Sequence, residues 1–353
     1  MLARFRFPLT VWLITHIAIV AIAGLTIFLW PFLYTAKGAV SAPISTLDGL
    51  CAWDCLAYAD IATRGYFRAL DTNFWPMLSL YARPFVWLHA SGQLAIVIVA
   101  QLASVVAYVS VYEVFEILDG ETAARWGLIV FAAYPFSFFY GVGYTETLMV
   151  AAGAGGMWLA LRGRHTWAAV AFAAGVLSRA PATLGWLGLA AVQLRDRTRW
   201  RTRAALLIPV AVGAMWPLYN WVAFHDPLQF VHSRGFWGWH AKLNLIRGFH
   251  YWRESRMLAV YPFFAVIPAA GVVALVFVRR WWPLAAIAVP TFVLFCAIGA
   301  YGFGRYSASV WPAFLPLGVW LSRRPTLQMP ILIASVLFQG FFLHLFAHAY
   351  ELQ

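Results

Sequence analysis

Three carboxylates and one cation stand close together in the first long polar segment of the chain. Asp48, Asp54, Asp60 and Arg64 all fall within the stretch DGLCAWDCLAYADIATRGY. Only 11% of the residues are charged, and an ionisable group beside a bilayer is costly unless it has a partner or a function. A carboxylate in such a place can take a proton from a hydroxyl group. Asp54 is the candidate base, because the ring of Trp53 beside it can shield it from water.

The charged residues also have structural explanations. Asp54 could instead cap the N-terminus of a juxtamembrane helix. Asp60 and Arg64 stand at positions i and i+4, which favours a local ion pair worth only ~0.3–0.5 kcal/mol when exposed. Glu146 falls where one apolar span meets the next, and Arg179 is its natural partner across the bundle. That pair could orient an active site or only join helices.

Composition places these residues in a membrane protein. Hydrophobic residues make up 63% of the 353 residues and the mean hydropathy is +0.75, against roughly 45–50% apolar residues in a soluble domain. The formal net charge is +12, but the basic residues form short clusters between apolar spans. A nucleic-acid partner would need them gathered on one soluble face, so none is expected, and the charge reports topology instead.

Apolar stretches suit a hydrocarbon core of roughly 30 Å and predict a single transmembrane domain, 1–353, with about eleven helices. The run after Arg4 and Arg6 is too long for the core of a cleavable signal and is expected to remain as the first span. Arginine clusters put the N-terminus in the cytoplasm and the C-terminus outside. The least regular segment, 166–194, is predicted to be two short helices or a re-entrant hairpin, broken near Arg179-Ala180-Pro181. The predicted spans are 8–34, 92–115, 123–140, 143–161, 166–178, 182–194, 204–224, 258–278, 282–300, 308–322 and 328–348.

Two large loops, 35–91 and 225–257, are predicted on the outer side, and chemistry is expected there. The second loop mixes aromatic and basic residues, which suits the anionic headgroups of membrane lipids, although an ordinary aromatic belt would look similar. Its histidines have no spacing typical of a metal pair, so no essential metal is expected. Cys51 and Cys55 stand four residues apart, a helical spacing that suits a disulfide poorly, and both are expected to be packing residues.

Several short motifs then resemble one family. The sequence is similar to the PIG-V-type GPI mannosyltransferases and their bacterial relatives, and the matching motifs occur in the same order from residue 53 to residue 316. Three residues depart from the pattern, Ala52, Ala57 and Ser79, and leave the acceptor open. The motifs are Trp53-Asp54, Tyr58, Ile61-Ala62, Gly65-Tyr66, Phe74-Trp75-Pro76, Arg83, Tyr134 to Phe139, Tyr144-Thr145-Glu146, Ser178-Arg179, Asp226 to Phe230, Gly304-Arg305-Tyr306 and Trp311-Pro312.

The resemblance implies an all-α polytopic membrane protein of the GT-C glycosyltransferase type, with juxtamembrane helices in the first outer loop. It implies an inverting mannosyltransferase that moves mannose from polyprenyl-phosphate-mannose to a lipid-linked or glycan acceptor on the extracytoplasmic side of the cell membrane. No cofactor is expected. Transfer from a lipid phosphate needs a base for the acceptor, stabilisation of an oxocarbenium-like centre and cations for the phosphate.

Roles follow for individual residues. Asp54 is the catalytic base. Arg305 is predicted to lie in a glycine-rich outer turn, where a guanidinium could grip the donor phosphate bidentately, or form a structural salt bridge. His240 and Lys242 are further candidates for binding that phosphate. The residues expected to shape the site are Trp53, Tyr58, Asp60, Arg64, Tyr66, Arg83, Tyr144, Glu146, Arg179 and Tyr306.

Two other functions fit the same composition. A transporter or flippase of a lipid-linked sugar would have a cavity at mid-membrane open to either side in turn, and often internal repeats. No convincing repeat relates the two halves of this sequence, and only the break at Pro181 is transporter-like. An accessory subunit is the third possibility, since the eukaryotic members of the resembled family work with a partner protein. In an enzyme, Asp54 is expected to face a cavity at the outer interface with Arg305 across it.

Overall fold

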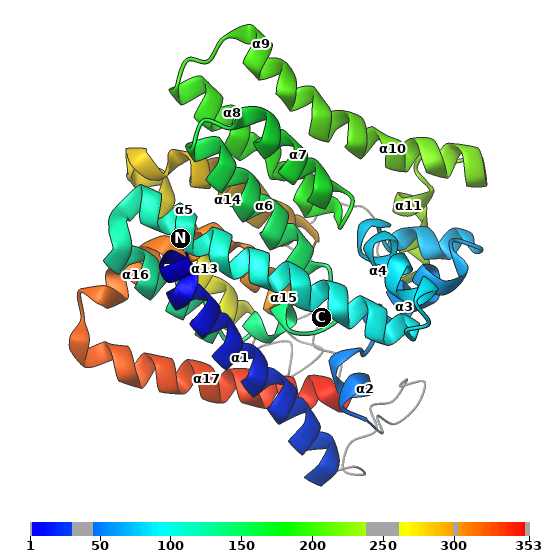
Figure 1. The fold of residues 1–353 in the computed structure, drawn as a ribbon, viewed down its shortest axis with the longest axis horizontal. Coiled ribbons are helices and arrows are strands. Elements are labelled where there is room, and N and C mark those ends of the chain that lie inside the picture. Colours follow the sequence, from blue (N-terminus) through cyan, green and yellow to red (C-terminus); the bar gives the residue numbers. More distant parts are fainter. Residues whose placement is uncertain (1, 30–44, 238–260, 299–302, 350–353) are drawn as a thin grey trace.

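The computed structural model describes residues 2–29, 45–237, 261–298 and 303–349 (Figure 1). Within these ranges the chain forms α-helices, short 3-10 turns and connections, with no strand. The elements are α1 (Leu2–Leu29), α2 (Thr46–Leu50), α3 (Asp54–Arg64), η1 (Ala69–Asn73), α4 (Met77–Trp87), α5 (Gly92–Ala133), η2 (Ser137–Tyr140), α6 (Glu146–Leu161), α7 (His165–Val176), η3 (Ala180–Leu184), α8 (Trp186–Arg195), α9 (Trp200–Arg203), η4 (Ala204–Leu206), α10 (Leu207–Phe224), α11 (Gln229–His232), η5 (Ser233–Trp237), α13 (Tyr261–Phe277), η7 (Arg279–Trp281), α14 (Trp282–Ile298), α15 (Phe303–Ser309), η9 (Trp311–Ala313), α16 (Phe314–Ser322) and α17 (Pro325–Ala347).

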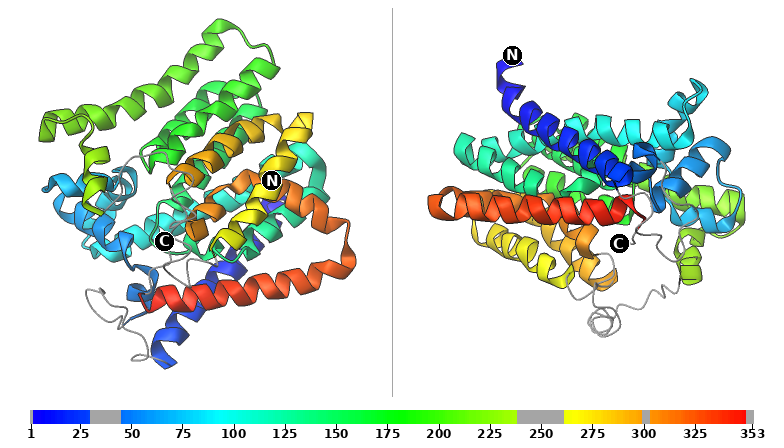
Figure 2. Two further views of the ribbon diagram at one scale, coloured as in Figure 1. Left: turned by 180° about the vertical axis from the view of Figure 1, so that it is seen from behind. Right: turned by 90° about the horizontal axis from the view of Figure 1, so that it is seen from below.

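The short elements of the first loop gather at one end of a bundle of longer helices. Figure 1 shows α3, α4 and α11 together at that end, and the views in Figure 2 agree. The N-terminus of α1 lies away from them, and α1 runs antiparallel to the first part of α5, since Trp12 bonds Ser104 while Arg4 reaches Glu113. The juxtamembrane helices expected in the first loop, 35–91, correspond to α2, α3 and α4.

Helix α5 forms the centre of the bundle and packs against α1, α3, α4, α6 and α16. Its one non-helical residue is Gly120, with φ 81°, which falls between the predicted spans 92–115 and 123–140. The helix ends at Ala133, earlier than predicted, because Pro135 has no amide hydrogen and disfavours helix in the residue before it. Gly318 of α16 lies against the backbone of Gly127 so closely that a side chain would collide there. Small residues of this kind let membrane helices approach each other.

Length and hydropathy identify four helical stretches that could each cross a membrane: 4–29, 92–133, 200–224 and 325–347. A fifth is counted if α13 and α14, which bend by 111° at their junction, are taken as one broken span. Helices α6 and α7 are apolar but shorter, so the count of eleven spans stays a prediction. The predicted break in 166–194 is present, because α7 ends at Val176 and α8 begins only at Trp186.

Arginines at the end opposite the loops have carboxylate partners on α5. Arg4 contacts Glu113 at 2.5 Å and Glu116 at 2.8 Å, and Arg162 contacts Glu113 at 3.3 Å. The side chain of Glu113 is fully buried. In the sequence these arginines indicate only topology, whereas the structure shows that α5 joins α1 to the end of α6 through a shared buried carboxylate.

Glu113→Gln is expected to lower the free energy of unfolding by about 1–3 kcal/mol, because it leaves two guanidinium groups without their shared carboxylate. Thermal unfolding of the purified protein in detergent, followed by tryptophan fluorescence, measures this loss. The control is Glu121→Gln, since Glu121 pairs with Arg125 where both side chains are more than half exposed and such pairs contribute at most about 0.5 kcal/mol. Equal melting temperatures for the two variants would contradict the bridging role of Glu113.

Candidate functional site

Asp54 is the first residue of α3 and follows an unusual turn. Helix α2 ends at Leu50, and Trp53 has φ 53° and ψ −115°, a backbone conformation that costs a bulky residue roughly 1–3 kcal/mol. The turn places the Asp54 carboxylate at the N-terminus of α3, where the helix dipole favours a negative charge. Trp53, which precedes the helix, makes no side-chain capping bond. The alternative in which Asp54 serves as the capping residue of this helix is therefore not observed.

Cys51 and Cys55 form a disulfide, so the prediction of two packing residues is wrong. Their Cα atoms are 5.0 Å apart, within the range that a disulfide spans. The prediction failed because it assumed a continuous helix, whereas the chain turns sharply at Trp53 and Cys51 lies outside α3. Gly143 packs directly on the Cys55 sulfur, where any side chain would collide, and its amide donates to the Leu50 carbonyl at 2.9 Å. The disulfide closes the turn that carries Asp54.

Four charged side chains from four parts of the chain meet at the loop end of the bundle, and we call them the ion network: Asp54, Glu146, Arg179 and Arg305. Arg305 Nη1 donates to Asp54 Oδ2 at 2.6 Å, and Arg305 Nε lies 3.0 Å from Glu146 Oε1. Arg179 Nη1 donates to the same oxygen of Glu146. The expected pair of Glu146 and Arg179 is therefore present, and Arg305 joins that pair to Asp54.

The ion network is buried unevenly. The side chain of Glu146 is 0% exposed and that of Arg305 7%, whereas that of Asp54 is 23% exposed. Among the residues that the structure describes, none bonds to Asp54 Oδ1. Glu146 Oε2 is buried, also without a hydrogen-bond partner in the described chain. The network therefore has one accessible carboxylate oxygen, Oδ1 of Asp54, and one buried acceptor, Oε2 of Glu146.

Aromatic rings surround the cations of the ion network. The guanidinium of Arg305 lies 5.2 Å from the ring centres of both Tyr144 and Tyr306, and that of Arg179 lies 5.0 Å from Tyr306. Such contacts favour a cation with little water around it. Tyr58 on α3 is buried beside the network, and burial, with the nearby charge of Asp54 second, raises the pKa of its hydroxyl. Tyr58 therefore stays protonated and can donate a hydrogen bond.

The motif from Tyr134 to Phe139 holds α15, which carries Arg305. The hydroxyl oxygen of Tyr134 lies 2.8 Å from Ser307 Oγ on α15 and 2.8 Å from the Phe264 carbonyl oxygen on α13. Tyr140, which follows the motif, donates to the Ala308 carbonyl at 2.5 Å. Gly304 lies so close to the Phe136 ring that a side chain would collide. Sequence reasoning found this motif only through the resemblance. The structure shows that it positions the guanidinium without contacting it.

The remaining predicted residues lie apart from the ion network. Asp60 and Arg64 form the expected local pair at 2.9 Å, with the arginine side chain 70% exposed. The hydroxyl of Tyr66 donates to a backbone carbonyl at 2.6 Å, and its ring packs on Trp216. Arg83 approaches the backbone at Gly65. His240 and Lys242 lie outside the described residues.

Ser79, one of the residues that departs from the family pattern, has a clear structural role. It is buried on α4, and its hydroxyl donates to the Tyr58 carbonyl at 2.8 Å. A proline would lack this hydroxyl, so the departure adds a bond between α4 and α3. The bond supports the helix that begins with Asp54.

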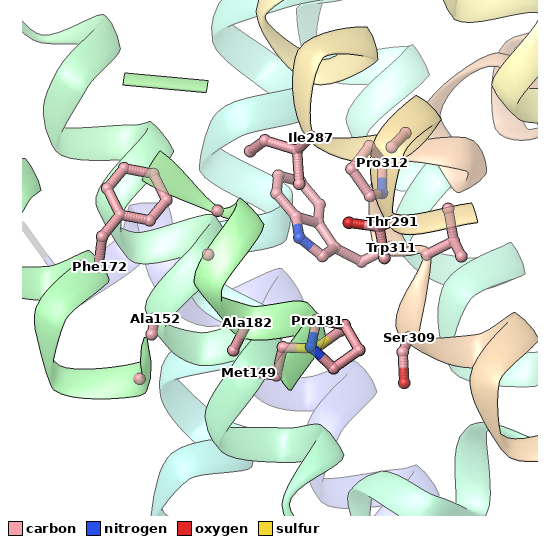
Figure 3. Close-up of a pocket in the computed structure, with 15 residues that line it drawn as sticks. Met149, Ala152, Phe172, Pro181, Ala182, Ile287, Thr291, Ser309, Trp311 and Pro312 are labelled. Carbon is pink, nitrogen blue, oxygen red and sulfur yellow. The ribbon is translucent and has the colours of Figure 1, made fainter. Parts of the chain in front are cut away.

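A small apolar cavity is lined by residues of α6, η3 and α14, with Trp311 and Pro312 (Figure 3). Its volume is only about 20 Å³, and its lining comes from α6, α7, η3, α14 and the chain around η9. Three lining residues come within about one helical turn after a charged residue of the network. They are Met149 on α6, Pro181 in η3 and Ser309 on α15. Apolar lining residues therefore follow the charged residues closely along the chain.

Histidines in the described part of the second outer loop do not form a metal centre. His232 Nδ1 lies 2.6 Å from Asp226 Oδ2, and this hydrogen bond lowers the pKa of the Asp226 carboxyl. Throughout the described ranges, no three His, Cys, Asp or Glu side chains are placed to hold a metal ion.

No family model matches the sequence, and no curated protein matches it. Solved structures share its fold at low identity. ArnT from Cupriavidus metallidurans bound to undecaprenyl phosphate matches with a TM-score of 0.58 at 13% identity, over 96% of this chain and 76% of that one. The Archaeoglobus fulgidus oligosaccharyltransferase, in complex with zinc and sulfate, matches with a TM-score of 0.53 at 15% identity, over 97% of this chain and 53% of that one. This chain thus spans about half the length of the oligosaccharyltransferase. The expected all-α, polytopic GT-C-type fold is confirmed.

The disulfide gives a direct prediction. The sequence has three cysteines, so alkylation of the denatured protein without reductant should label only Cys296, and alkylation after reduction should label all three. Replacing both Cys51 and Cys55 by serine should lower the free energy of unfolding by about 2 kcal/mol, the value for closing so short a loop. Peptide mass spectrometry and thermal unfolding are the measurements, with Cys296→Ser as the control. Three labelled thiols in the unreduced protein would show that no bridge forms.

Proposed function

We propose that this protein is an inverting glycosyltransferase that moves mannose from polyprenyl-phosphate-mannose to a lipid-linked or glycan acceptor on the extracytoplasmic side of the membrane. The observation that carries the proposal is the accessible Oδ1 of Asp54 on a carboxylate whose other oxygen is fixed by Arg305. The shared fold with membrane glycosyltransferases supports it. Mannose itself comes from the sequence resemblance.

The reaction assigned to this geometry needs one carboxylate. Asp54 Oδ1 takes the proton of the acceptor hydroxyl while the acceptor oxygen bonds to the anomeric carbon. The bond from that carbon to the phosphate oxygen breaks, and its electron pair leaves with the phosphate. Attack opposite to the leaving group inverts the anomeric centre, so no covalent intermediate is required. The buried Oε2 of Glu146 can accept a hydrogen bond from a sugar hydroxyl, which would satisfy an otherwise unpaired acceptor.

The surroundings of the ion network suit an amphiphilic donor. A polyprenyl-phosphate sugar has a polar head and an apolar tail, and apolar residues that line the cavity follow Glu146 and Arg179 within one helical turn of the chain. The ArnT structure was solved with undecaprenyl phosphate, which supports a lipid phosphate as the donor type for this fold. A charge cluster at the loop end also favours transfer over transport, because a transporter would need its polar site near mid-membrane.

Two features support an extracytoplasmic site and a cytoplasmic N-terminus. Disulfides persist outside the cytoplasm and are rare inside it, and the disulfide between Cys51 and Cys55 lies beside Asp54. At the other end of the bundle lie Arg4, Arg162 and Arg280, as expected for loops that face the cytoplasm.

The test incubates the purified protein with radiolabelled polyprenyl-phosphate-mannose and a panel of lipid and glycan acceptors. Asp54→Asn keeps the shape of the side chain but removes its basicity, so the transfer rate should fall by about 10²–10⁴-fold while donor binding is retained. Asp226→Asn is the matched control, because Asp226 is a partly exposed outer carboxylate that pairs with His232, away from the ion network. Its rate should equal that of the wild type.

Two results would contradict the proposal. Normal transfer by Asp54→Asn would show that Asp54 is not the base. Wild-type protein that binds the donor but transfers sugar to no acceptor would favour the transporter alternative.

A further inference from the structure

The ion network carries no net charge, and this limits what Arg305 can bind. Two carboxylates and two guanidinium groups contact each other directly. Arg305 contacts a carboxylate through Nε and another through Nη1, and its side chain is only 7% exposed. A donor phosphate that bonded to Arg305 would have to compete with Asp54 or Glu146. The resting network therefore lacks an uncompensated positive charge for an anion.

Arg234 supplies such a charge at the same place. It follows α11 in η5, its side chain is half-buried, and none of the described carboxylates pairs with it. Phe230 of α11 packs on the hydrophobic cluster of Trp75, Leu177 and Trp216, against which Ala180 also packs, so the segment that leads to Arg234 lies beside the chain at Arg179. The charge of Arg179 acts on Arg234. Burial lowers the pKa of its guanidinium, and the like charge of Arg179 acts in the same direction. A partly desolvated cation beside another cation is unfavourable until an anion joins it.

The backbone that carries Arg234 is held firmly in place. The buried hydroxyl of Ser233, the preceding residue, donates to the Ala69 carbonyl at 2.7 Å and is 2.9 Å from Thr72 Oγ1, both in η1. Gln229 donates to the same hydroxyl at 3.0 Å. These bonds fasten the start of the second outer loop to the first, so Arg234 is positioned in advance of ligand binding.

We propose that Arg234 binds the phosphate of the lipid carrier, together with Arg179. This assignment rests on the proposed function and names the phosphate ligand at the same site. A polyprenyl-phosphate sugar is a phosphodiester with one negative charge, which matches the one positive charge that Arg234 adds to the neutral ion network within the described ranges. The guanidinium fork can hold two phosphate oxygens at once. In the transfer reaction it faces the phosphate oxygen on which negative charge develops.

Binding of undecaprenyl phosphate to the purified full chain in nanodiscs tests the assignment, with the neutral alcohol undecaprenol as the second probe. Arg234→Gln should raise the Kd for the phosphate about 10- to 100-fold, the range for a lost charged hydrogen-bonded contact. It should leave the Kd for undecaprenol unchanged. Arg234→Lys keeps the charge but lacks the forked guanidinium, so its Kd for undecaprenyl phosphate should fall between those of the wild type and Arg234→Gln.

Arg68→Gln is the control, because it removes a positive charge from the same loop layer where Arg68 is 60% exposed and paired with Asp71. Its Kd for undecaprenyl phosphate should match that of the wild type. Equal Kd values for wild type and Arg234→Gln would overturn the role of Arg234. Failure of the wild type to bind undecaprenyl phosphate at all would instead refute the proposed function. A loss of undecaprenol binding in Arg234→Gln would show a structural effect and would also overturn the assignment.

Discussion

The contact of Arg305 with Asp54 and Glu146 is the interaction on which the site depends. It joins residues 251 positions apart in the chain and brings α3, α6 and α15 to one point. Charges buried to this degree are tolerated only when each has partners, because the cost of desolvation exceeds what a single pair returns. Removal of one member would leave another buried and unpaired. The ion network therefore constrains the ends of several helices at once.

Local features of the chain place each member of the network. Asp54 and Glu146 each begin a helix, where the N-terminal dipole favours a carboxylate. Arg179 stands in the break between α7 and η3, and its extended backbone directs the chain away from the preceding helix. Arg305 depends on α15, which the tyrosines of the η2 region fasten to the bundle. The disulfide then fixes the turn at Trp53 against the strain of its backbone.

Much of this arrangement could be predicted from the sequence, and the failures have physical causes. Hydropathy predicts the all-helical membrane fold, and Pro181 predicts the break near 179–181. The scarcity of charge predicts the pair of Glu146 and Arg179. The disulfide could not be predicted, because i,i+4 spacing excludes it only in a continuous helix. The bond between Arg305 and Asp54 could not be derived from local patterns, since neither segment indicates which distant residue its charged side chain contacts. The bridging role of Glu113 could not be predicted, because in the sequence its arginine partners indicate only topology.

Arg305 has two expected roles, as a salt-bridge partner and as a phosphate ligand, and the proposed reaction relates them. Before transfer Asp54 is a carboxylate and holds Nη1 of Arg305. When Asp54 accepts the proton of the acceptor it becomes neutral, and its attraction for the guanidinium falls. At the same step the phosphate gains the charge that the carboxylate lost, because a diester becomes a monoester. In the proposed reaction one negative charge thus passes from Asp54 to the phosphate, and the attraction of Arg305 for the phosphate increases, alongside that of Arg234. The electrostatic balance of the site is kept while the bond is exchanged.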